Sequence, residues 1–338
     1  MESPAGYTST STSTVLVLGA NGRFGLAATR AFAAAGWRVL AQVRREAVAG
    51  IPAGVELVRA PLATLVGALD ELPAPSVVVH GVNPIYTRWD EEALPAALAA
   101  MDLAERLGAR FMLPGNVYNY GEAMPSRLDP TTPQRPTTAK GRIRVEMEAE
   151  LERRAAAGRL RATVITAGDF FGDGTGSWFD QAIVKPIARG RLDYPGDPAL
   201  MHAWAYLPDL ARAFVAVAAM PARPAFERFT FAGHSVTGDE FLAAVEDAAA
   251  TLGVAPVHGW RHGRTPWPVI RAVGLVVPMW RELARMSYLW RVPHALDGTA
   301  LEGVVGPISH TPLALALARS LRQLGVGGAA SALRPGPA

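Results

Sequence analysis

The stretch that decides the fold is VLVLGANGRFG, residues 15–25. Its first four residues, 15–18, are apolar and two of them are β-branched, which favours a strand buried on both faces of a parallel sheet. A glycine-rich turn, 19–25, follows at once, and the alanine-rich residues 26–36 then predict a helix that ends at Gly36. A strand, a glycine turn and a helix in this order are typical of a dinucleotide-binding turn.

The three glycines of this turn have separate physical roles. Gly19 allows a sharp turn, Gly22 allows the backbone to approach a pyrophosphate, and Gly25 allows the helix to pack closely on the strand. The unpaired N–H groups at the start of the helix would then face the phosphates. The alternative is a glycine turn that serves only the packing of helix on sheet.

Length and composition limit the classes of protein to which the chain can belong. With 338 residues it is long enough for one large domain or two modest ones, and half of its residues are apolar. It has no cysteine, which excludes disulfides and thiolate chemistry and fits a reducing cytoplasm, where we expect the protein. A formal charge of +3 without a dense Lys/Arg tract predicts no nucleic-acid partner.

The first and last residues of the chain predict tails, and its most apolar later stretch is short. The polar, low-complexity residues 1–14 predict a disordered tail rather than a secretory signal, and residues 326–338 predict a flexible tail. The stretch 267–280 is too short to span a bilayer and contains Arg271. We therefore expect no membrane partner, and a helix in the core or at a subunit interface.

Strands and helices alternate along the chain. Short apolar runs, several rich in β-branched residues, predict strands at 15–18, 38–43, 54–59, 76–80, 110–113 and 161–166. Helical patterns occur at 26–36, 64–72, 91–107, 140–157, 177–189, 210–219, 238–252 and 311–324, and 168–176 predicts an irregular loop. The alternation predicts an α/β fold, a Rossmann-type doubly wound parallel sheet. We expect an NAD(P)-binding domain and a smaller C-terminal substrate lobe, the first from 15–167 and 201–232, the second from 168–200 and 233–325.

Several segments carry motifs that are specific when they are taken together and in order. GANGRFG has the spacing GxxGxxG, the segment 116–121 ends in Tyr-Gly, and Lys140 is followed by an acid, Glu146. Residues 167–172 and 190–211 add two further matching segments. Over roughly residues 15–219 the chain resembles the extended short-chain dehydrogenases/reductases, the NAD-dependent epimerase/dehydratase family. The resemblance implies an NAD(P)-dependent activity, with 167–172 beside the nicotinamide.

The resemblance implies a catalytic role for Lys140, which we expect to open its helix as an exposed residue beside the cofactor. The family's catalytic tyrosine stands four residues earlier, where this chain has Pro136, and its catalytic Ser or Thr falls on Asn116. The usual proton-donating pair is therefore missing. Asn116 can still donate a hydrogen bond to a carbonyl, and Tyr118 can supply a phenol. If the segment is extended, Tyr118 and Tyr120 point to the same side; the alternative is that both pack under the loop.

The end of the second strand predicts the choice of cofactor. NAD-binding proteins usually place an Asp or Glu there for the ribose 2′-hydroxyl, whereas here Val43 stands there and Arg44 and Arg45 follow. A guanidinium binds a 2′-phosphate through charge-assisted hydrogen bonds, so we predict NADP rather than NAD unless both arginines are solvated. The residues expected to contact the cofactor are Gly19, Asn21, Gly22, Arg23, Phe24, Gly25, Arg44, Arg45, Gly81, Asn83, Lys140 and Gly168.

Other polar residues receive structural roles by default. We expect Asp209 to cap the helix that follows it and Asp169 to be a turn residue, while His202 has substrate contact as the alternative to a core position. Arg144 and Glu148 lie four residues apart, which favours a solvated helix face. The spacing of histidines and carboxylates predicts no metal site.

Two classes of function follow from these observations. The first is an NAD(P)-dependent reductase, epimerase or dehydratase for a small or nucleotide-linked substrate, which the full-length C-terminal lobe favours. The second is a catalytically degenerate binding protein that senses NADP and regulates a partner, as the NmrA-like members of the superfamily do. The missing Ser/Tyr pair favours this second class. A homodimer is compatible with both.

Overall fold

The computed structural model of the chain describes residues 13–44, 46, 49–221 and 223–327. The predicted tails at 1–14 and 326–338 therefore lie almost entirely outside the described residues. Within the described part, Thr14 is already buried as the first residue of β1 (Thr14–Leu18), so this strand begins one residue earlier than predicted.

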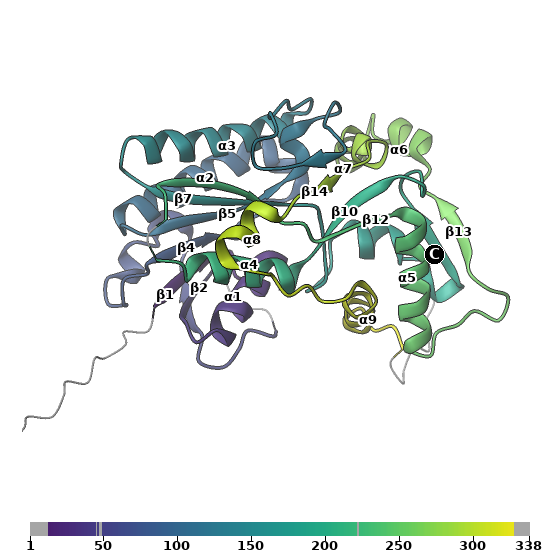
Figure 1. Ribbon diagram of the computed structural model, residues 1–338, viewed down its shortest axis with the longest axis horizontal. Helices are drawn as coiled ribbons and strands as arrows, with labels where there is room; N and C mark the ends of the chain where they lie inside the picture. Colours follow the sequence, from purple (N-terminus) through teal and green to yellow (C-terminus); the bar gives the residue numbers. More distant parts are fainter. Residues whose placement is uncertain (1–12, 45, 47–48, 222, 328–338) are drawn as a thin grey trace, which may run out of the picture.

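A seven-stranded sheet forms the centre of the fold, and its order is β11-β7-β5-β4-β1-β2-β3 (Figure 1). All neighbouring strands are parallel. The chain runs from β1 outward to β3 and then returns to the other side of β1 for β4, so the order reverses between β1 and β4. This confirms the doubly wound, Rossmann-type sheet. All six predicted strands are present, and β11 adds a seventh; beyond β1 they are β2 (Arg38–Val43), β3 (Glu56–Arg59), β4 (Val77–His80), β5 (Arg110–Asn116), β7 (Arg161–Ala167) and β11 (Phe226–Thr230).

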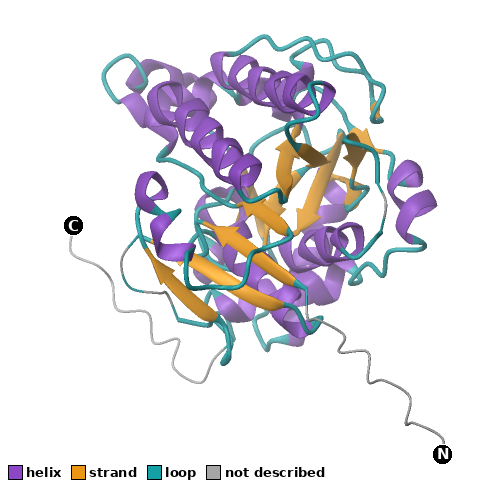
Figure 2. Ribbon diagram, turned by 90° about the vertical axis from the view of Figure 1, so that its left-hand side faces the viewer, coloured by secondary structure: helices purple, strands orange, loops and turns teal. Residues whose placement is uncertain are grey.

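Helices cover both faces of this sheet (Figure 2). Val15 and Val17 of β1 pack in one core with α1 and α4, whereas Leu16 and Leu18 pack in a second core with α2 and α3. Because successive side chains of a strand point to opposite faces, β1 is buried from both sides, as its apolar run predicts. The helices are α1 (Arg23–Ala34), α2 (Trp89–Arg106), α3 (Ala139–Ala156) and α4 (Leu207–Ala218).

A second group of elements lies beyond the carboxyl ends of the strands, at the right in Figure 1. It contains the sheet β12-β10-β8 and the pairs β13-β9 and β14-β6. Its core is aromatic, since the buried rings of Trp204 and Phe241 stack with their centroids 4.2 Å apart. The elements are β6 (Arg127–Leu128), β8 (Asp169–Phe171), β9 (Arg191–Tyr194), β10 (Met201–Tyr206), β12 (His234–Thr237), α5 (Gly238–Thr251), β13 (Arg261–Arg264), β14 (Ala295–Leu296) and α9 (Leu313–Gln323). The short helix α8 (Thr299–Val305) instead packs against β11 and α4 of the central fold.

Two predicted helices and one predicted loop have other structures. Residues 64–72 lie in 3-10 turns, and residues 177–189 contain one π-helical turn and one 3-10 turn. Pro186 separates the latter two because proline has no N–H for a helical hydrogen bond. The loop predicted at 168–176 contains strand β8, which pairs with β10. The turns are η1 (Leu62–Thr64), η2 (Gly67–Leu69), η5 (Phe179–Ile183) and η6 (Ile187–Arg189).

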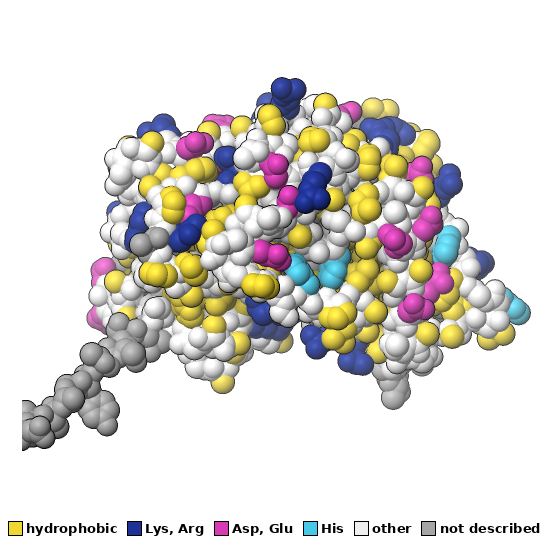
Figure 3. Space-filling model, viewed as in Figure 1, with side chains coloured by type: hydrophobic (Ala, Val, Ile, Leu, Met, Phe, Trp, Pro, Cys, Tyr) yellow, Lys and Arg dark blue, Asp and Glu magenta, His cyan; other side chains and the backbone are white. Residues whose placement is uncertain are grey.

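The apolar stretch 267–280 forms two short helices, α6 (Trp267–Val273) and the start of α7 (Pro278–Arg285). The expected burial in the core is wrong for this stretch, because Leu275 and Val276 are each 81% exposed. In Figure 3, hydrophobic and basic side chains gather over α6 and α7, at the upper right. A subunit interface at this stretch stays a prediction.

Two carboxylates have structural partners that the sequence does not indicate. The prediction that Glu148 faces solvent is wrong, since it is buried, accepts a hydrogen bond from Asn119 at 2.7 Å and pairs with Arg228 at 2.8 Å. The prediction that Asp209 caps α4 is also wrong. Asp209 lies in the first turn of α4 and accepts hydrogen bonds from the N–H and hydroxyl of Thr311 at 2.6 and 2.7 Å. Both carboxylates therefore join segments that are distant in the sequence.

Candidate active site

The strand order reverses between β1 and β4. Their carboxyl ends lie at the same edge of the sheet as those of β5 and β7. The glycine turn follows β1, Gly81 follows β4, Asn116 ends β5 and Gly168 follows β7. Predicted site residues from four separate segments thus lie at one edge of the sheet. Open α/β sheets bind their ligands at this kind of edge.

The turn at this edge leaves no room for side chains. A Cβ on Gly25 would collide with the carbonyl oxygen of Gly19, and one on Gly81 would stand 2.9 Å from the Cα of Gly25. Gln42 of β2 fixes the turn, because its Oε1 accepts from the N–H of Gly19 at 2.9 Å and its Nε2 donates to the carbonyl of Ala60 at 2.6 Å. Sequence reasoning missed Gln42, although a polar residue within the apolar run VLAQV was a usable indication.

The N-terminus of α1 presents backbone N–H groups at this edge. Gly22 is the N-cap, no side chain caps the helix, and its first turn holds no acidic residue, so the described surroundings suit an anion. The side chain of Phe24 is buried in the core, which leaves only its backbone for a cofactor. Arg23 reaches the second group of elements, where its guanidinium donates to the carbonyls of Phe170 and Gly172 at 3.2 and 3.1 Å. Burial lowers the pKa of Arg23.

The end of β2 is arranged as the sequence indicates. Val43 is buried and Arg44, directly after the strand, is exposed, while Arg45 lies outside the described residues. The side-chain amide of Asn21 donates to the carbonyl of Glu46 at 2.8 Å, which joins the glycine turn to this segment. Arg44 therefore follows β2 at the same edge of the sheet as the glycine turn.

Asn116 and Tyr118 belong to one tight turn. Asn116 caps the 3-10 turn η4 (Val117–Tyr120), since its Oδ1 accepts from the N–H of Tyr118 at 3.1 Å. This bond leaves the Nδ2 of Asn116 as the end that can donate to a ligand. The segment is a 3-10 turn rather than extended, so the alternation of an extended segment does not apply to Tyr118 and Tyr120, and both pack against one core cluster. Tyr120 is buried in a core cluster, whereas Tyr118 is only partly buried.

An aromatic group surrounds Tyr118. Its hydroxyl is hydrogen-bonded to that of Tyr86, and its ring centroid lies 6.4 Å from that of Trp89. The indole N–H of Trp89 donates to the Oδ1 of Asn83 at 3.1 Å, which ties this group to the loop after β4. Burial raises the pKa of Tyr118 to about 12, and the negative charge of Asp169 adds to the shift. The phenol is therefore protonated at neutral pH.

Lys140 lies in the first turn of α3, as expected, but it is buried rather than exposed. Its Nζ donates to the carbonyl of Tyr86 at 2.8 Å and forms an ion pair with Glu282 of α7 at 2.9 Å. The same Nζ lies 4.4 Å from the centroid of the Tyr86 ring. Gly141 allows α3 to pack closely on η4, because a Cβ there would collide with the carbonyl oxygen of Tyr118. The Lys140 side chain thus joins α3, the loop after β4, and α7.

Asp169 and His202 are paired beside this group. The prediction of a turn residue at Asp169 is wrong, because it lies in β8 and its carboxylate stands 2.9 Å from the Nε2 of His202 on β10. His202 is buried and stacks on Trp290, with ring centroids 4.3 Å apart. The ring of His294 lies 4.7 Å from that of His202, and burial lowers the pKa of His294 to about 4. The position of Asp169 directly after Gly168, in the segment expected beside the nicotinamide, could have marked it as a candidate site residue.

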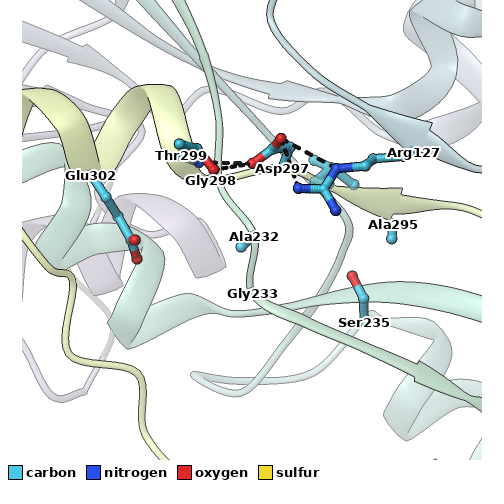
Figure 4. A pocket seen from close by; sticks show the side chains of 10 residues that line it. Arg127, Ala232, Gly233, Ser235, Ala295, Asp297, Gly298, Thr299 and Glu302 are labelled. Atoms are coloured by element: carbon cyan, nitrogen blue, oxygen red, sulfur yellow. Dashed lines mark hydrogen bonds and ion pairs between the residues drawn. The ribbon is translucent and has the colours of Figure 1, made fainter.

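A separate hollow of about 450 Å³ opens between α8, β14 and the segment after β11 (Figure 4). At its rim Arg127 pairs with Asp297 at 2.8 Å, and Asp297 also accepts from the N–H and hydroxyl of Thr299. The described residues predicted for the cofactor or for catalysis do not line it. Its lining consists of Arg127, Ala232, Gly233, Ser235, Ala295, Leu296, Asp297, Gly298, Thr299 and Glu302.

The doubly wound sheet and the glycine turn at its switch point define a Rossmann-type, dinucleotide-binding class of protein. The chain belongs to the NAD dependent epimerase/dehydratase family, whose model matches residues 15–230. This finding confirms the resemblance on which the sequence analysis relied.

Solved structures of similar fold cover nearly the whole chain. MoeE5 in complex with UDP-glucose and NAD is 19% identical with a TM-score of 0.70, and the match covers 93% of this chain and 98% of that one. TunA, an NAD-dependent NDP-hexosamine 5,6-dehydratase involved in tunicamycin biosynthesis, is 15% identical with a TM-score of 0.70 and the same coverage. UDP-glucose 4-epimerase from Bifidobacterium longum, in complex with NAD+ and UDP, is 15% identical with a TM-score of 0.71, covering 94% of this chain and 100% of that one. At these identities the likeness establishes the fold.

No curated protein sequence matches the chain. Among the described residues, no helix combines the length and apolarity that crossing a membrane requires. Within the same residues, no group of three or more His, Cys, Asp or Glu side chains is placed to hold a metal ion.

Proposed function

We propose that the chain is an NAD(P)-dependent oxidoreductase, epimerase or dehydratase that acts on a small or nucleotide-linked substrate, with a nucleotide sugar as the first choice. The observation that carries this proposal is the glycine turn 19–25, which brings an uncapped helix N-terminus to the switch point of the sheet. The similar structures support the substrate class, since one holds UDP-glucose and another acts on an NDP-hexosamine.

The residues at the switch point fit a dinucleotide. The N–H groups that follow Gly22 would bind the pyrophosphate, because they are backbone donors at the positive end of α1. Lys140 would bind the nicotinamide ribose, provided that its Nζ shares or exchanges Glu282. Arg44 would bind a 2′-phosphate, which supports NADP although the similar structures hold NAD. When bound, the cofactor supplies a hydride donor and acceptor.

Residues other than the usual Ser/Tyr pair would donate the hydrogen bond and the proton to the substrate oxygen. The Nδ2 of Asn116 would donate a hydrogen bond to a substrate oxygen, because its Oδ1 is held by the backbone. Tyr118 would donate the proton, since burial holds its pKa at about 12 and keeps the phenol protonated. A phenol that stays protonated cannot accept a proton from an alcohol, which favours protonation of an oxyanion over removal of a proton.

The direct test is an activity assay with matched variants. Full-length protein is incubated with NAD or NADP and with UDP-glucose, UDP-glucuronic acid and UDP-N-acetylglucosamine, and the products are separated by chromatography. Turnover that Asn116→Ala and Tyr118→Phe both reduce supports the proposal. Turnover that neither variant changes would remove these residues from the mechanism.

A second function is kept because one observation favours it. The Nζ of Lys140 already has two partners, Glu282 and the carbonyl of Tyr86, and Pro136 stands where the family has its tyrosine. A side chain held in this way suits a protein that binds NADP and signals its presence without turnover. Tight NADP binding without conversion of any nucleotide sugar, ketone or aldehyde would favour this sensor over the enzyme.

We also propose that cofactor binding and substrate binding belong to different parts of the chain. Residues 15–167 with 201–232 would bind the cofactor, and residues 168–200 with 233–325 would bind the substrate. We also propose a cytoplasmic location, which the absence of cysteine supports, and a homodimer as one state of assembly. Light scattering of the purified protein measures the assembly.

A further inference from the structure

The region 266–285, here called the α6–α7 hairpin, carries six of the ten large apolar side chains that are exposed in the described part of the chain. All seven consecutive residues from 275 to 281 are exposed. Folded monomers rarely leave such a continuous apolar stretch in water unless it binds something. Its exposed large apolar side chains are Val269, Leu275, Val276, Val277, Met279 and Trp280.

The opposite face of the hairpin is firmly packed. Ile270 is only 9% exposed, and Glu282 is buried in its ion pair with Lys140 at 2.9 Å. The chain then enters the core at Met286, which is 1% exposed. The inner face is thus fixed to the protein, and the apex at Leu275 and Val276 points away from it.

The exposed charges of the hairpin itself have one sign. Arg264, Arg271, Arg281 and Arg285 are all exposed, and in Figure 3 basic side chains stand among the hydrophobic ones over α6 and α7. Between residues 263 and 291 the only acidic residue is Glu282. It is buried and paired with both Lys140 and Arg285, so it does not offset the basic rim.

We propose that the α6–α7 hairpin docks on the surface of an anionic lipid bilayer, with its apex in the interface and its arginines against the headgroups. A helix with a Trp-containing apolar face and a polar face rich in arginine is typical of such interfacial segments. A second copy of this chain fits less well, because a twofold contact would bring Arg271 and Arg281 against the same basic surface. This inference is independent of the proposed enzyme activity, and it revises the expectation of no membrane partner.

The test measures the binding of the full-length protein to vesicles by flotation. The vesicles contain either phosphatidylcholine alone or equal parts of phosphatidylcholine and phosphatidylglycerol. We expect binding only to the anionic vesicles, and a loss of affinity at high salt. Arg271→Gln and Arg281→Gln should each weaken binding about fivefold. Leu275→Ser/Val276→Ser should weaken it at least about tenfold.

A matched control uses an apolar residue that is exposed elsewhere. Val257 is 94% exposed and lies outside the hairpin, so Val257→Ser should bind the anionic vesicles as wild type does. Because Leu275 and Val276 are each 81% exposed, their variant should keep the thermal stability of the wild type. Absence of binding to anionic vesicles, or equal binding by wild type and the double variant, would overturn the proposal. A wild-type dimer that Leu275→Ser/Val276→Ser dissociates, without vesicle binding, would overturn it in favour of a second copy.

Discussion

Replacing Lys140 with methionine tests the buried lysine on which both the site and the hairpin depend. Methionine has a similar length but no charge, so Glu282 loses the ion pair that Nζ provides at 2.9 Å. Both side chains are buried, with 3% and 10% of their surfaces exposed. Removing one partner of a buried pair costs roughly 3–5 kcal/mol. Arg285 still contacts Glu282 at 2.7 Å, so we expect the lower end, a loss of about 3 kcal/mol in the free energy of unfolding.

A double variant separates this stability effect from the cofactor contact. The double variant Lys140→Met/Glu282→Gln no longer has the buried negative charge of Glu282, so most of the lost stability should return. Binding of NADP should stay weak in both variants, because each lacks the cation for the nicotinamide ribose. The expected loss is about 1.5–3 kcal/mol, or roughly 10- to 150-fold in Kd. Urea denaturation measures the stability, and fluorescence titration measures the Kd.

Lys185 offers a matched control on the surface. It is exposed, and Lys185→Met should change the free energy of unfolding by no more than about 0.5 kcal/mol and leave the Kd for NADP unchanged. An unchanged urea midpoint in Lys140→Met would refute the buried ion pair. A double variant that binds NADP as tightly as wild type would refute the contact between Lys140 and the ribose.

Three further predictions concern the cofactor, the acid and pH. Arg44→Ala should weaken NADP binding at least about tenfold and leave NAD binding unchanged, and equal wild-type affinities for the two cofactors would speak against this role. Tyr118→Phe should lower kcat by about 100-fold or more with little change in KM; unchanged turnover would place the acid elsewhere. Burial lowers the pKa of His80 to about 3 and that of His294 to about 4, so the unfolded chain takes up these protons first as the pH falls. Above about pH 6.5 neither histidine lowers the free energy of unfolding. Below that pH, each of them lowers it by about 1.4 kcal/mol per pH unit. Urea midpoints across this range should fall less steeply in His80→Phe, and an equally steep profile would contradict the account.

The central strands were predictable because helices bury both of their faces. The run VLVL in β1 and the run VVV in β4 leave no polar position, and both strands lie in the middle of the sheet. β11 has the sequence FERFT and lies at the sheet edge. It was not predicted, because its charged residues interrupt the apolar pattern of a buried strand. Glu227 in this strand is buried, and Arg110 lies 3.9 Å away on β5. A partner so distant in the sequence cannot be inferred from local pattern.

The same distinction separates the predictable part of the site from the rest. The glycine turn depends on local backbone geometry, so Gly19 and Gly25 could be assigned from their spacing alone. The burial of Lys140 depends on Glu282, which belongs to a helix far along the chain. The pairing of Asp169 with His202 likewise depends on how β8 meets β10. These contacts are tertiary, and the sequence pattern around each residue does not contain them.

We propose that the switch point binds a dinucleotide whose reacting end meets an altered catalytic group. A crystal structure of the full-length protein with bound NADP tests it most directly. We expect the pyrophosphate on the N–H groups that follow Gly22, the nicotinamide beside Asn116 and Tyr118, and the Nζ of Lys140 within hydrogen-bond distance of the ribose. A cofactor bound away from the glycine turn, or a Lys140 that contacts only Glu282 and Tyr86 while NADP is present, would contradict it.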